Sequence, residues 1–370
     1  MTGGMAPHKS NMKTIIVSFA PEFLSLALNE LSRHLGEIQS SPLARGIHTV
    51  HFHKPLKHLL HAWKKQPPIY IHHLFPVHKR LEVEAKAKDL LRQLRRVLRK
   101  TTLLRRLDKT KTFAAQVRAI DCYPSVTTDV VSGAIENLAH KMTKARVDVR
   151  SPEQVLSVLI TKNGTWLGLS NVEENVSPWS GGGPPIPPDR GRLNRAEYKL
   201  IEALMSFDIA LPIGGHTLDL GAGPGGWTRV LLNMGQKVTA VSPRSLVDEL
   251  LHDERVQYHK LLAEEFLSQA LNKGALFDFM TNDMFLVPQD SARLMVEFAP
   301  LLRDGGHAIV TLKLRCKDWR KVMSHTFRIL RRAFIIPRIK HLFFNHREVT
   351  VWLKKNLKKS VSSTATELLK

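Results

Sequence analysis

The sequence predicts an α/β fold in the C-terminal half of the chain, built on an open parallel sheet, with an α+β region before it. From Leu193 onward, strand patterns alternate with helical patterns, which is typical of a parallel sheet. Residues 217–234 of that half contain a strand, a glycine-dense turn and an amphipathic helix. Residues 171–191 are rich in proline, glycine and serine, so we expect a connector between the halves rather than a packed element.

The glycine-dense turn follows a predicted strand, Thr217–Leu220, and precedes a predicted helix, Thr228–Met234. Glycines stand at positions 221, 223, 225 and 226. Because they lack Cβ atoms, a ligand can approach the backbone, and amides at the start of the helix can face an electron-rich group. The letters also satisfy the G-x-G-x-x-G dinucleotide fingerprint, which is a weak signal on its own. The turn therefore predicts a cofactor site whose ligand the rest of the chain must identify.

The other elements of the C-terminal half complete the sheet. Further helices are predicted over Ala196–Ser206, through Ala299, and over Trp319–Phe334. The predicted strands are Lys237–Ser242, Val256–Tyr258, Phe277–Thr281 and Ala308–Leu314, the last after a turn at Asp304-Gly305-Gly306, and then a terminal hairpin of Arg338–Phe344 and Glu348–Leu353.

The N-terminal half mixes strands and helices in a different order. Its predicted helices are Pro21–Leu35 and Val126–Met142. Its predicted strands are Thr14–Phe19, Ile47–Phe52, Ile69–Phe75 and Thr112–Ile120, followed by a hairpin over residues 154–169 that turns at Lys162-Asn163-Gly164.

Residues 81–107 form a predicted helical stretch that is dense in basic side chains. Arginines and lysines interleave with leucines that can pack on a core, and few acidic residues accompany them. A solvated face and a phosphate-binding face both fit this pattern, and the shortage of acids favours phosphate contact. The basic residues are Arg92, Arg95, Arg96, Arg99, Lys100, Arg105 and Arg106.

The whole chain is strongly basic. Its 370 residues hold 55 Lys and Arg against 33 Asp and Glu, a net charge of +22. Neutralised phosphates release counterions whatever the base sequence, so a surplus of this size favours a nucleic-acid partner over an anionic membrane surface.

The remaining composition excludes several classes of protein. Only Cys122 and Cys316 are present, so a disulfide framework cannot be built and a reducing cytoplasm is expected. The apolar runs are too short for a membrane span. Histidines such as His51, His72 and His73 cluster near the N-terminus, but no carboxylate or cysteine completes a ligand set, so we assign no metal.

Four charged residues stand where a ligand crevice is expected. Asp283 follows the predicted fourth strand, Lys313 ends the fifth and Glu348 begins the last, while Lys199 lies on the helix before the glycine turn. The carboxyl ends of the strands border the crevice of an open α/β sheet, so Asp283 and Lys313 can converge on whatever the turn holds. Each residue alone would usually be a surface charge.

Together these residues resemble a known family. Asp219 with Pro224-Gly225-Gly226-Trp227 resembles motif I of S-adenosylmethionine (SAM) methyltransferases, in the D-x-G-x-x-P-G-G-W form of the FtsJ-like RNA ribose 2′-O-methyltransferases. Lys199, Asp283, Lys313 and Glu348 resemble the Lys-Asp-Lys-Glu tetrad of that family. The resemblance implies a Rossmann-like SAM-dependent domain in which these four are catalytic.

The resemblance also implies the residues that bind SAM. The turn would contact the methionine part, Glu264 the adenine amine, and Asp283 would also lie near the sulfonium. Ser242 stands where the family has an acid for the ribose hydroxyls, and Arg244 near it could suit a 2′-phosphate. The expected cofactor-binding residues are Asp219, Gly221, Gly223, Pro224, Gly225, Gly226, Trp227, Ser242, Glu264 and Asp283.

The N-terminal half resembles a THUMP domain, the RNA-binding module of many RNA-modifying enzymes, through Asp148-Val149-Arg150-Ser151-Pro152 and the hairpin after it. With the entry Gly168-Leu169-Ser170-Asn171 into the second half, the chain resembles the RlmM type of the FtsJ-like family. We expect a leader (1–11), an α+β subdomain (12–80), a THUMP-like domain (81–170), a linker (171–191), a methyltransferase domain (192–355) and a tail (356–370).

The predicted function is SAM-dependent 2′-O-methylation of RNA, and the resemblance points to a cytidine of the large-subunit (23S) ribosomal RNA. A ribose hydroxyl is a weak nucleophile, so a lysine must accept its proton or orient its oxygen, and burial beside cationic groups can lower a lysine's pKa toward that task. We assign this role to Lys313. Two alternatives remain open at this point: a non-catalytic RNA-binding ribosome-assembly factor, and an NADP-binding oxidoreductase.

Overall fold

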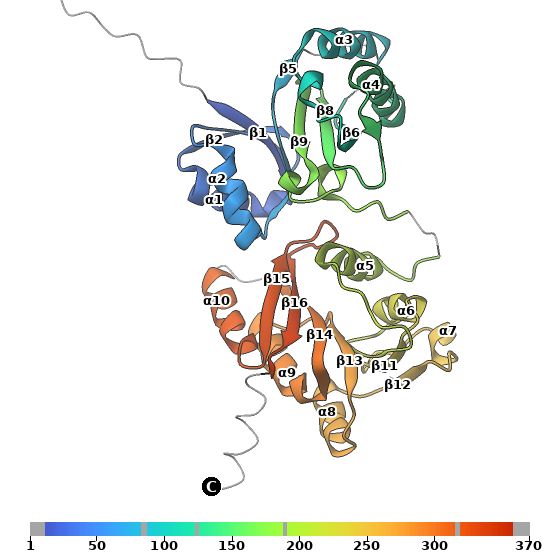
Figure 1. Cartoon of the computed structure of the whole chain (residues 1–370). Helices are drawn as coiled ribbons and strands as arrows, with labels where there is room; N and C mark the ends of the chain where they lie inside the picture. Colours follow the sequence, from blue (N-terminus) through green and yellow to red (C-terminus); the bar gives the residue numbers. More distant parts are fainter. Residues whose placement is uncertain (1–11, 83–86, 123–125, 188–190, 315–318, 358–370) are drawn as a thin grey trace, which may run out of the picture. The chain divides into compact units, whose positions relative to one another are not determined.

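The computed structural model describes residues 12–82, 87–122, 126–187, 191–314 and 319–357. The chain divides into two compact units, residues 1–185 and 186–370, here named unit 1 and unit 2 (Figure 1). The expected connector at 171–191 lies across this division. We describe each unit by itself.

The first sheet of unit 1 is antiparallel, with strand order β2-β3-β1-β4. It contains β1 (Lys13–Phe19), β2 (Ile38–Ala44), β3 (Ile47–Phe52) and β4 (Ile71–Pro76), accompanied by helices α1 (Leu24–Leu35) and α2 (Leu56–Lys65). Strands β1, β3 and β4 and helix α1 confirm predictions at nearly the expected bounds. Strand β2 escaped prediction because its Ser-Ser-Pro run has low β-propensity, which an edge strand tolerates.

The second sheet of unit 1 has the order β5-β9-β8-β6-β7. Its strands are β5 (Lys79–Leu81), β6 (Thr112–Ala119), β7 (Arg146–Val147), β8 (Gln154–Thr161) and β9 (Gly164–Asn171). The predicted hairpin is confirmed, with Thr161 opposite Gly164. Helix α4 (Thr128–Thr143) connects β6 to β7, which run parallel. Unit 1 is therefore an α+β structure with two sheets.

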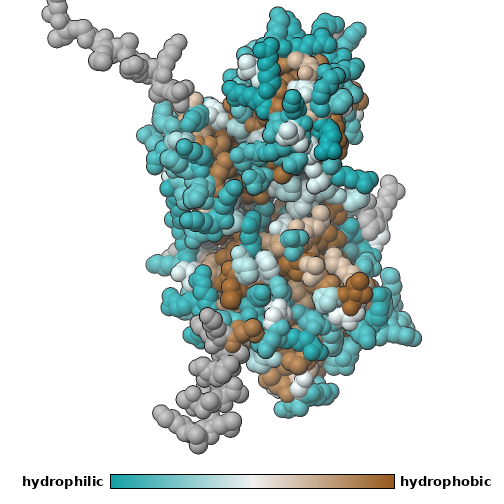
Figure 2. Space-filling view, in the orientation of Figure 1, coloured by the Kyte–Doolittle hydropathy of each residue, from teal (hydrophilic) through white to brown (hydrophobic). Residues whose placement is uncertain are grey.

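Helix α3 (Ala87–Lys100) shows why the basic stretch folds as it does. Leu90, Leu94 and Leu98, spaced by four residues, are buried in the core that covers the second sheet. The basic side chains lie on the other side of the helix and are exposed, and Figure 2 shows a hydrophilic surface over this part of unit 1. The leucine pattern thus fixes the helix and leaves its cations in solvent.

The expected connector is partly folded. Residues 172–182 form two short 3₁₀ helices, η3 (Val172–Asn175) and η4 (Ser180–Gly182), and pack within unit 1. Asn175 is fully buried, and its Oδ1 accepts a 2.7 Å hydrogen bond from Ser170 Oγ. The prediction of an unpacked segment is therefore wrong for these residues, because composition does not show which glycines are needed for close packing.

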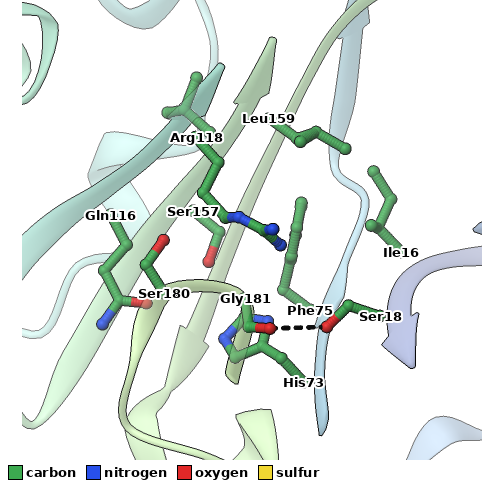
Figure 3. A pocket seen from close by; sticks show the side chains of 11 residues that line it. Ile16, Ser18, His73, Phe75, Gln116, Arg118, Ser157, Leu159, Ser180 and Gly181 are labelled. Carbon is green, nitrogen blue, oxygen red and sulfur yellow. Dashed lines mark hydrogen bonds between the residues drawn. The ribbon is translucent and has the colours of Figure 1, made fainter. Parts of the chain in front are cut away.

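Gly181 is one such glycine (Figure 3). Its carbonyl accepts a 2.9 Å hydrogen bond from Ser18 Oγ on β1. Its φ is +67°, and a Cβ atom there would lie 2.0 Å from Nη1 of Arg118 on β6. The space beside it, lined also by Ser157 and Gln116, measures about 10 Å³, room for no more than one water. A side chain at position 181 would therefore have to displace the Arg118 guanidinium and adopt a backbone conformation that favours glycine.

Unit 2 contains one seven-stranded sheet with the order β12-β11-β10-β13-β14-β16-β15. The strands are β10 (His216–Leu220), β11 (Lys237–Val241), β12 (Val256–His259), β13 (Phe277–Asn282), β14 (Leu302–Lys313), β15 (Phe334–Lys340) and β16 (Glu348–Lys355). All neighbours are parallel except β16, which is antiparallel to β14 and β15. The predicted open α/β sheet and terminal hairpin are confirmed.

The helices of unit 2 are α5 (Ala196–Phe207), α6 (Gly226–Asn233), α7 (Asp248–Leu251), α8 (Ala263–Asn272), α9 (Pro288–Phe298) and α10 (Trp319–Leu330). The first strand of the sheet is β10. Strands β11 and β12 are added on one side of it, and β13 and the later strands on the other. The strand order therefore reverses beside β10. Ligands of such sheets bind at the carboxyl edge of this reversal.

One predicted turn of unit 2 is wrong. Asp304-Gly305-Gly306 lies inside β14 rather than before it. The pairing of β13 with β14 passes from Phe277–Leu302 directly to Phe279–His307, so the residues between them bulge out of the ladder. Gly305, with φ +76°, permits the bulge. The Asp-Gly-Gly sequence does interrupt the regular strand, but it forms a bulge within β14 and not a turn before it.

Candidate active site

The structure brings the four predicted catalytic side chains into one ring of alternating charge. Lys199 Nζ lies 2.7 Å from Asp283 Oδ2 and 3.0 Å from Glu348 Oε1. Lys313 Nζ lies 2.7 Å from Asp283 Oδ1 and 2.5 Å from Glu348 Oε2. Each lysine thus bridges both carboxylates, and each carboxylate uses one oxygen for each lysine.

The fold explains why the ring closes. Asp283 directly follows β13, Lys313 ends β14 and Glu348 begins β16, so all three lie at the carboxyl edge of the parallel strands. Lys313 and Glu348 are direct partners in the antiparallel register of β14 and β16, which puts their side chains on the same face. Helix α5 adds Lys199 from outside the sheet.

The ring members are mostly buried, with side-chain exposures between 8% and 18%. Burial raises the pKa of Asp283, but the ammonium groups of Lys313 and Lys199 outweigh it and hold that pKa below its ordinary value. The pKa of Glu348 is lowered against burial by the same two lysines. Burial lowers the pKa of Lys199, yet the two carboxylates raise it overall. Each of these three groups is therefore stabilised in its charged form.

Thr311, which the sequence reading missed, joins the ring. Its hydroxyl donates to Asp283 Oδ1 and accepts a 2.9 Å hydrogen bond from Lys313 Nζ. With Asp283 and Glu348, Thr311 occupies all three N–H donors of the Lys313 ammonium. A threonine inside a strand is common for its β-propensity alone, so no sequence signal marked this one.

Glu202, on the same helix as Lys199, is a second residue that the sequence reading missed. Its carboxylate accepts hydrogen bonds of 2.7 and 2.9 Å from the backbone amides of Phe343 and Phe344, in the loop between β15 and β16. Burial raises the pKa of Glu202 to about 7. This contact holds helix α5 against the loop that leads to Glu348.

The glycine turn begins from a buried carboxylate. Asp219 is 1% exposed, and its two oxygens accept hydrogen bonds of 2.7 and 2.8 Å from the hydroxyls of Thr228 on α6 and Thr281 on β13. Burial raises the pKa of Asp219 to about 6. Asp219 therefore ties together β10, β13 and the helix after the turn, a structural task that the sequence reading had not assigned to it.

Comparison with known proteins agrees with this geometry. Residues 193–299, which include Lys199, the glycine turn and Asp283, match the family model of the FtsJ-like methyltransferases. This segment is therefore similar to the FtsJ-like methyltransferases. Lys313 and Glu348 lie outside the matched residues. The pairing of β14 with β13 and β16 brings their side chains next to Asp283.

The curated relatives point the same way. The ribosomal RNA large subunit methyltransferase M of Azoarcus sp. (strain BH72) is 33% identical over 211 residues, 54% of this chain and 56% of that protein. The protein of the same name from Thauera aminoaromatica is 33% identical over 232 residues, 59% of this chain and 62% of its own. An uncharacterised protein of Methanocaldococcus jannaschii is 31% identical over 174 residues, 44% of this chain and 47% of its own. The chain thus spans between about half and three-fifths of the length of these relatives.

Within the FtsJ-like segment, the glycines have a role that the sequence reading did not foresee. A Cβ atom at Gly221 would lie 2.4 Å from Met284 Cγ, and one at Gly223 would lie 2.3 Å from the carbonyl oxygen of Arg244. At Gly225 and Gly226 the obstacles are Leu250 and Asn194. These glycines let neighbouring parts of the protein approach the turn, in addition to any ligand.

The turn of the FtsJ-like segment is also anchored to helix α5. Trp227 is 4% exposed, and its indole Nε1 donates a 2.7 Å hydrogen bond to the carbonyl of Ala196. Glu197, two residues before Lys199, accepts two 2.8 Å hydrogen bonds from Arg229 on α6. The helix that carries Lys199 and the helix that begins at the turn are therefore held together.

The two residues expected at the far end of the cofactor lie in different surroundings. Ser242 directly follows β11 and is 5% exposed, and its hydroxyl accepts a 3.1 Å hydrogen bond from the Arg244 amide. Glu264 is exposed in the first turn of α8. Their contact with a cofactor remains a prediction.

Two features are absent from the described residues. None of the helices there combines the length and apolar character needed to cross a membrane. Over the same ranges, no three His, Cys, Asp or Glu side chains come together as a metal site.

Proposed function

We propose that this protein transfers a methyl group from SAM to a ribose 2′-oxygen of RNA, and that the RNA belongs to the large ribosomal subunit. One observation carries the proposal: the charged ring lies at the carboxyl edge of the sheet, beside the reversal of strand order. Its members are Lys199, Asp283, Lys313 and Glu348. The names of the relatives support the ribosomal substrate. A cytidine is the nucleotide that the RlmM resemblance implies.

The residues that would hold SAM are those of the glycine turn, with Ser242 and Glu264 toward the adenosine. They fit the cofactor because the turn runs into the amino end of α6, which presents amide donors, while Asp219 is buried beneath it and needs no ligand. When bound, SAM supplies a methyl group on a positively charged sulfur.

Lys313 acts on the acceptor. Its ammonium uses its three donors on Asp283, Glu348 and Thr311, so an incoming hydroxyl replaces the neutral Thr311 more easily than either carboxylate. In that position the lysine orients the hydroxyl oxygen and stabilises the negative charge that develops on it, while the hydroxyl proton passes to one of the ring carboxylates, Asp283 or Glu348. Asp283 and Glu348 orient the lysine, and Lys199 balances their charge. Most of the rate gain comes from holding the oxygen in line with the methyl group.

Unit 1 would bind the RNA. We assign the THUMP-like role to residues 81–170 and a supporting role to residues 12–80, on the basis of the exposed cations of α3 and the net charge of +22. With only two cysteines in the chain, we expect the protein to act in the cytoplasm.

The test is methyl transfer from labelled SAM to total RNA from a strain that lacks this gene, followed by nuclease digestion and nucleoside mass spectrometry. We expect 2′-O-methylcytidine from the wild type and a loss of at least 100-fold in Lys313→Ala. Lys273→Ala, which removes an exposed lysine of the same unit, is the matched control and keeps full activity.

Two results would contradict the proposal. Full methylation by Lys313→Ala would show that the charged ring does not have the catalytic role assigned to it. Calorimetry that gives no heat with SAM would favour a non-catalytic RNA-binding factor, or an oxidoreductase if NADPH binds instead.

A further inference from the structure

A cavity of about 610 Å³ opens beside Lys313 in unit 2. This volume falls within the range of about 300–1,000 Å³ that is typical of small-molecule sites. Its described lining comes from the segment after Asp283, from the start of α9 and from α10. Phe285, Val287 and Pro288 form an apolar side, and His325 on α10 adds a polar group.

Two large apolar side chains of this lining are exposed to an unusual degree. Phe285 is 65% exposed and Val287 is 59% exposed. They lie two and four residues after Asp283, so the segment that carries the reactive ring also presents them. Exposed apolar groups beside polar residues usually mark a binding site for a ligand or a partner.

The backbone before Phe285 is fixed. The amide of Met284 donates a 3.0 Å hydrogen bond to Asn282 Oδ1, and the Met284 side chain occupies the space left by Gly221. Because Met284 is held at both backbone and side chain, the backbone of Phe285 starts from a defined position.

The cavity is separate from the cofactor site. Among the described residues that line it, none belongs to the glycine turn at 221–227. Lys313 belongs to both the cavity lining and the charged ring. Whatever fills the cavity therefore brings its own atoms to the lysine that handles the acceptor oxygen.

We propose that this cavity holds the base of the nucleotide that is methylated, stacked on the ring of Phe285. The inference rests on the proposed function, since it takes the oxygen at Lys313 to be a ribose hydroxyl. A nucleobase has flat apolar faces and a polar edge, which matches an aromatic and aliphatic side with His325 nearby. Enzymes that modify nucleotides take the target out of its stack and commonly place it against aromatic side chains.

The experiment compares Phe285→Leu, which removes the aromatic ring, with Phe285→Tyr, which keeps it. Ile213→Ala is the matched control, because Ile213 is an apolar residue of the same unit that is 96% exposed. Methyl transfer to total RNA from a strain lacking this gene gives KM and kcat. Saturation-transfer NMR with CMP and AMP reports contact with the base protons without any reaction.

We expect Phe285→Leu to raise KM for RNA by roughly ten- to a hundredfold, which corresponds to one lost base stack. The same variant loses saturation transfer to CMP, while Phe285→Tyr and Ile213→Ala retain both properties and all variants keep the heat of SAM binding. A Phe285→Leu protein that matches the wild type in KM and in CMP contact would overturn the proposal. So would a parallel loss of SAM binding, which would make Phe285 a support of the cofactor site.

The two proposals fail separately. If the wild type methylates no RNA but CMP contacts the protein only when an aromatic ring is present at position 285, the proposed function falls and the cavity stands only as a nucleotide-binding site. If Lys313→Ala abolishes methylation while Phe285→Leu changes nothing, the function stands and the cavity assignment falls.

Discussion

At the scale of single residues, Thr311 connects the two halves of the charged ring. Its hydroxyl touches both Asp283 and Lys313. Thr311→Val keeps the shape of the side chain and removes the hydroxyl, so Lys313 loses one of its three partners. When the acceptor hydroxyl takes the place of Thr311 at Lys313, the Thr311 hydroxyl can still orient Asp283. We therefore expect kcat for methyl transfer to fall about tenfold in the valine variant, with SAM affinity unchanged. Thr311→Ser, which keeps the hydroxyl, should retain wild-type kcat, and equal losses in both variants would contradict the assigned role.

Asp219 makes stability depend on pH. Its pKa is about 6 in the folded protein against an ordinary value near 3.8, so the folded state binds more protons between these values. The resulting stabilisation is complete below about pH 4 and is lost as the pH rises through about 6, an effect on the order of 3 kcal/mol. Asp219→Asn should flatten this part of the curve of unfolding free energy against pH, measured by urea titration.

The control for this measurement is Asp208→Asn. Asp208 is exposed in the same unit and has φ +52°, a conformation that asparagine also tolerates. An unchanged pH slope in Asp219→Asn would show that another group causes the dependence.

The positions of single residues could be predicted where their charge and their place at a strand end both indicated the same site. Lys199, Asp283, Lys313 and Glu348 could be placed together because three of them mark strand ends of a predictable sheet. Glu202 could not be found in this way. Its role is to bind two backbone amides 141 and 142 residues away, and no local pattern encodes such a contact.

At the scale of elements, α3 is the part of unit 1 whose charge can be tested most directly. Replacing Arg92, Arg95, Arg96 and Arg99 by glutamine keeps helix propensity and removes four exposed cations. If all four contact phosphates, the slope of log affinity against log salt should become shallower by about 3 to 4. Binding of total RNA measured at several salt concentrations checks this.

The matched variant replaces the same four arginines by lysine. It preserves charge and should keep a slope near that of the wild type. A glutamine variant that binds RNA with unchanged affinity and slope would show that this face of α3 is only solvated.

The folded part of the predicted connector gives an element-scale prediction about stability. Gly181→Ala would place a Cβ atom against Arg118 and hold alanine at φ +67°, so we expect a loss of about 2–4 kcal/mol in the free energy of unfolding. Gly274→Ala isolates the backbone strain, since φ there is +62° and no heavy atom lies within 4 Å of the added Cβ. Equal losses in denaturant titrations of the two variants would mean that packing at Gly181 contributes nothing.

The errors at this scale share one cause. Proline and glycine predict breaks in regular structure, but they do not distinguish a free loop from a chain segment packed into the protein. At 172–182 the signal marked packed 3₁₀ turns, and at 304–306 it marked a bulge inside β14. Both outcomes depend on contacts with strands that are distant in the sequence.

At the scale of the whole molecule, the sequence predicted the class of each half correctly. Unit 2 is an open α/β sheet with an antiparallel terminal hairpin, and unit 1 is α+β. Periodicity suffices for such a result because hydrophobic patterns determine which faces are buried. The cavity beside Lys313 could not be predicted from periodicity. Its shape depends on how α9, α10 and the end of β14 are placed relative to one another, and not on any one segment.

The pairing of Lys313 with Glu348 limits how this protein can change over evolution. The two residues face each other only because β14 and β16 are in one register, and successive side chains of a strand point to opposite faces. Gaining or losing a single residue in the loop before Glu348, with the strand shifted to match, would turn that carboxylate to the other face of the sheet. Changes in the length of this loop are therefore tolerated only when the loop absorbs them before Glu348.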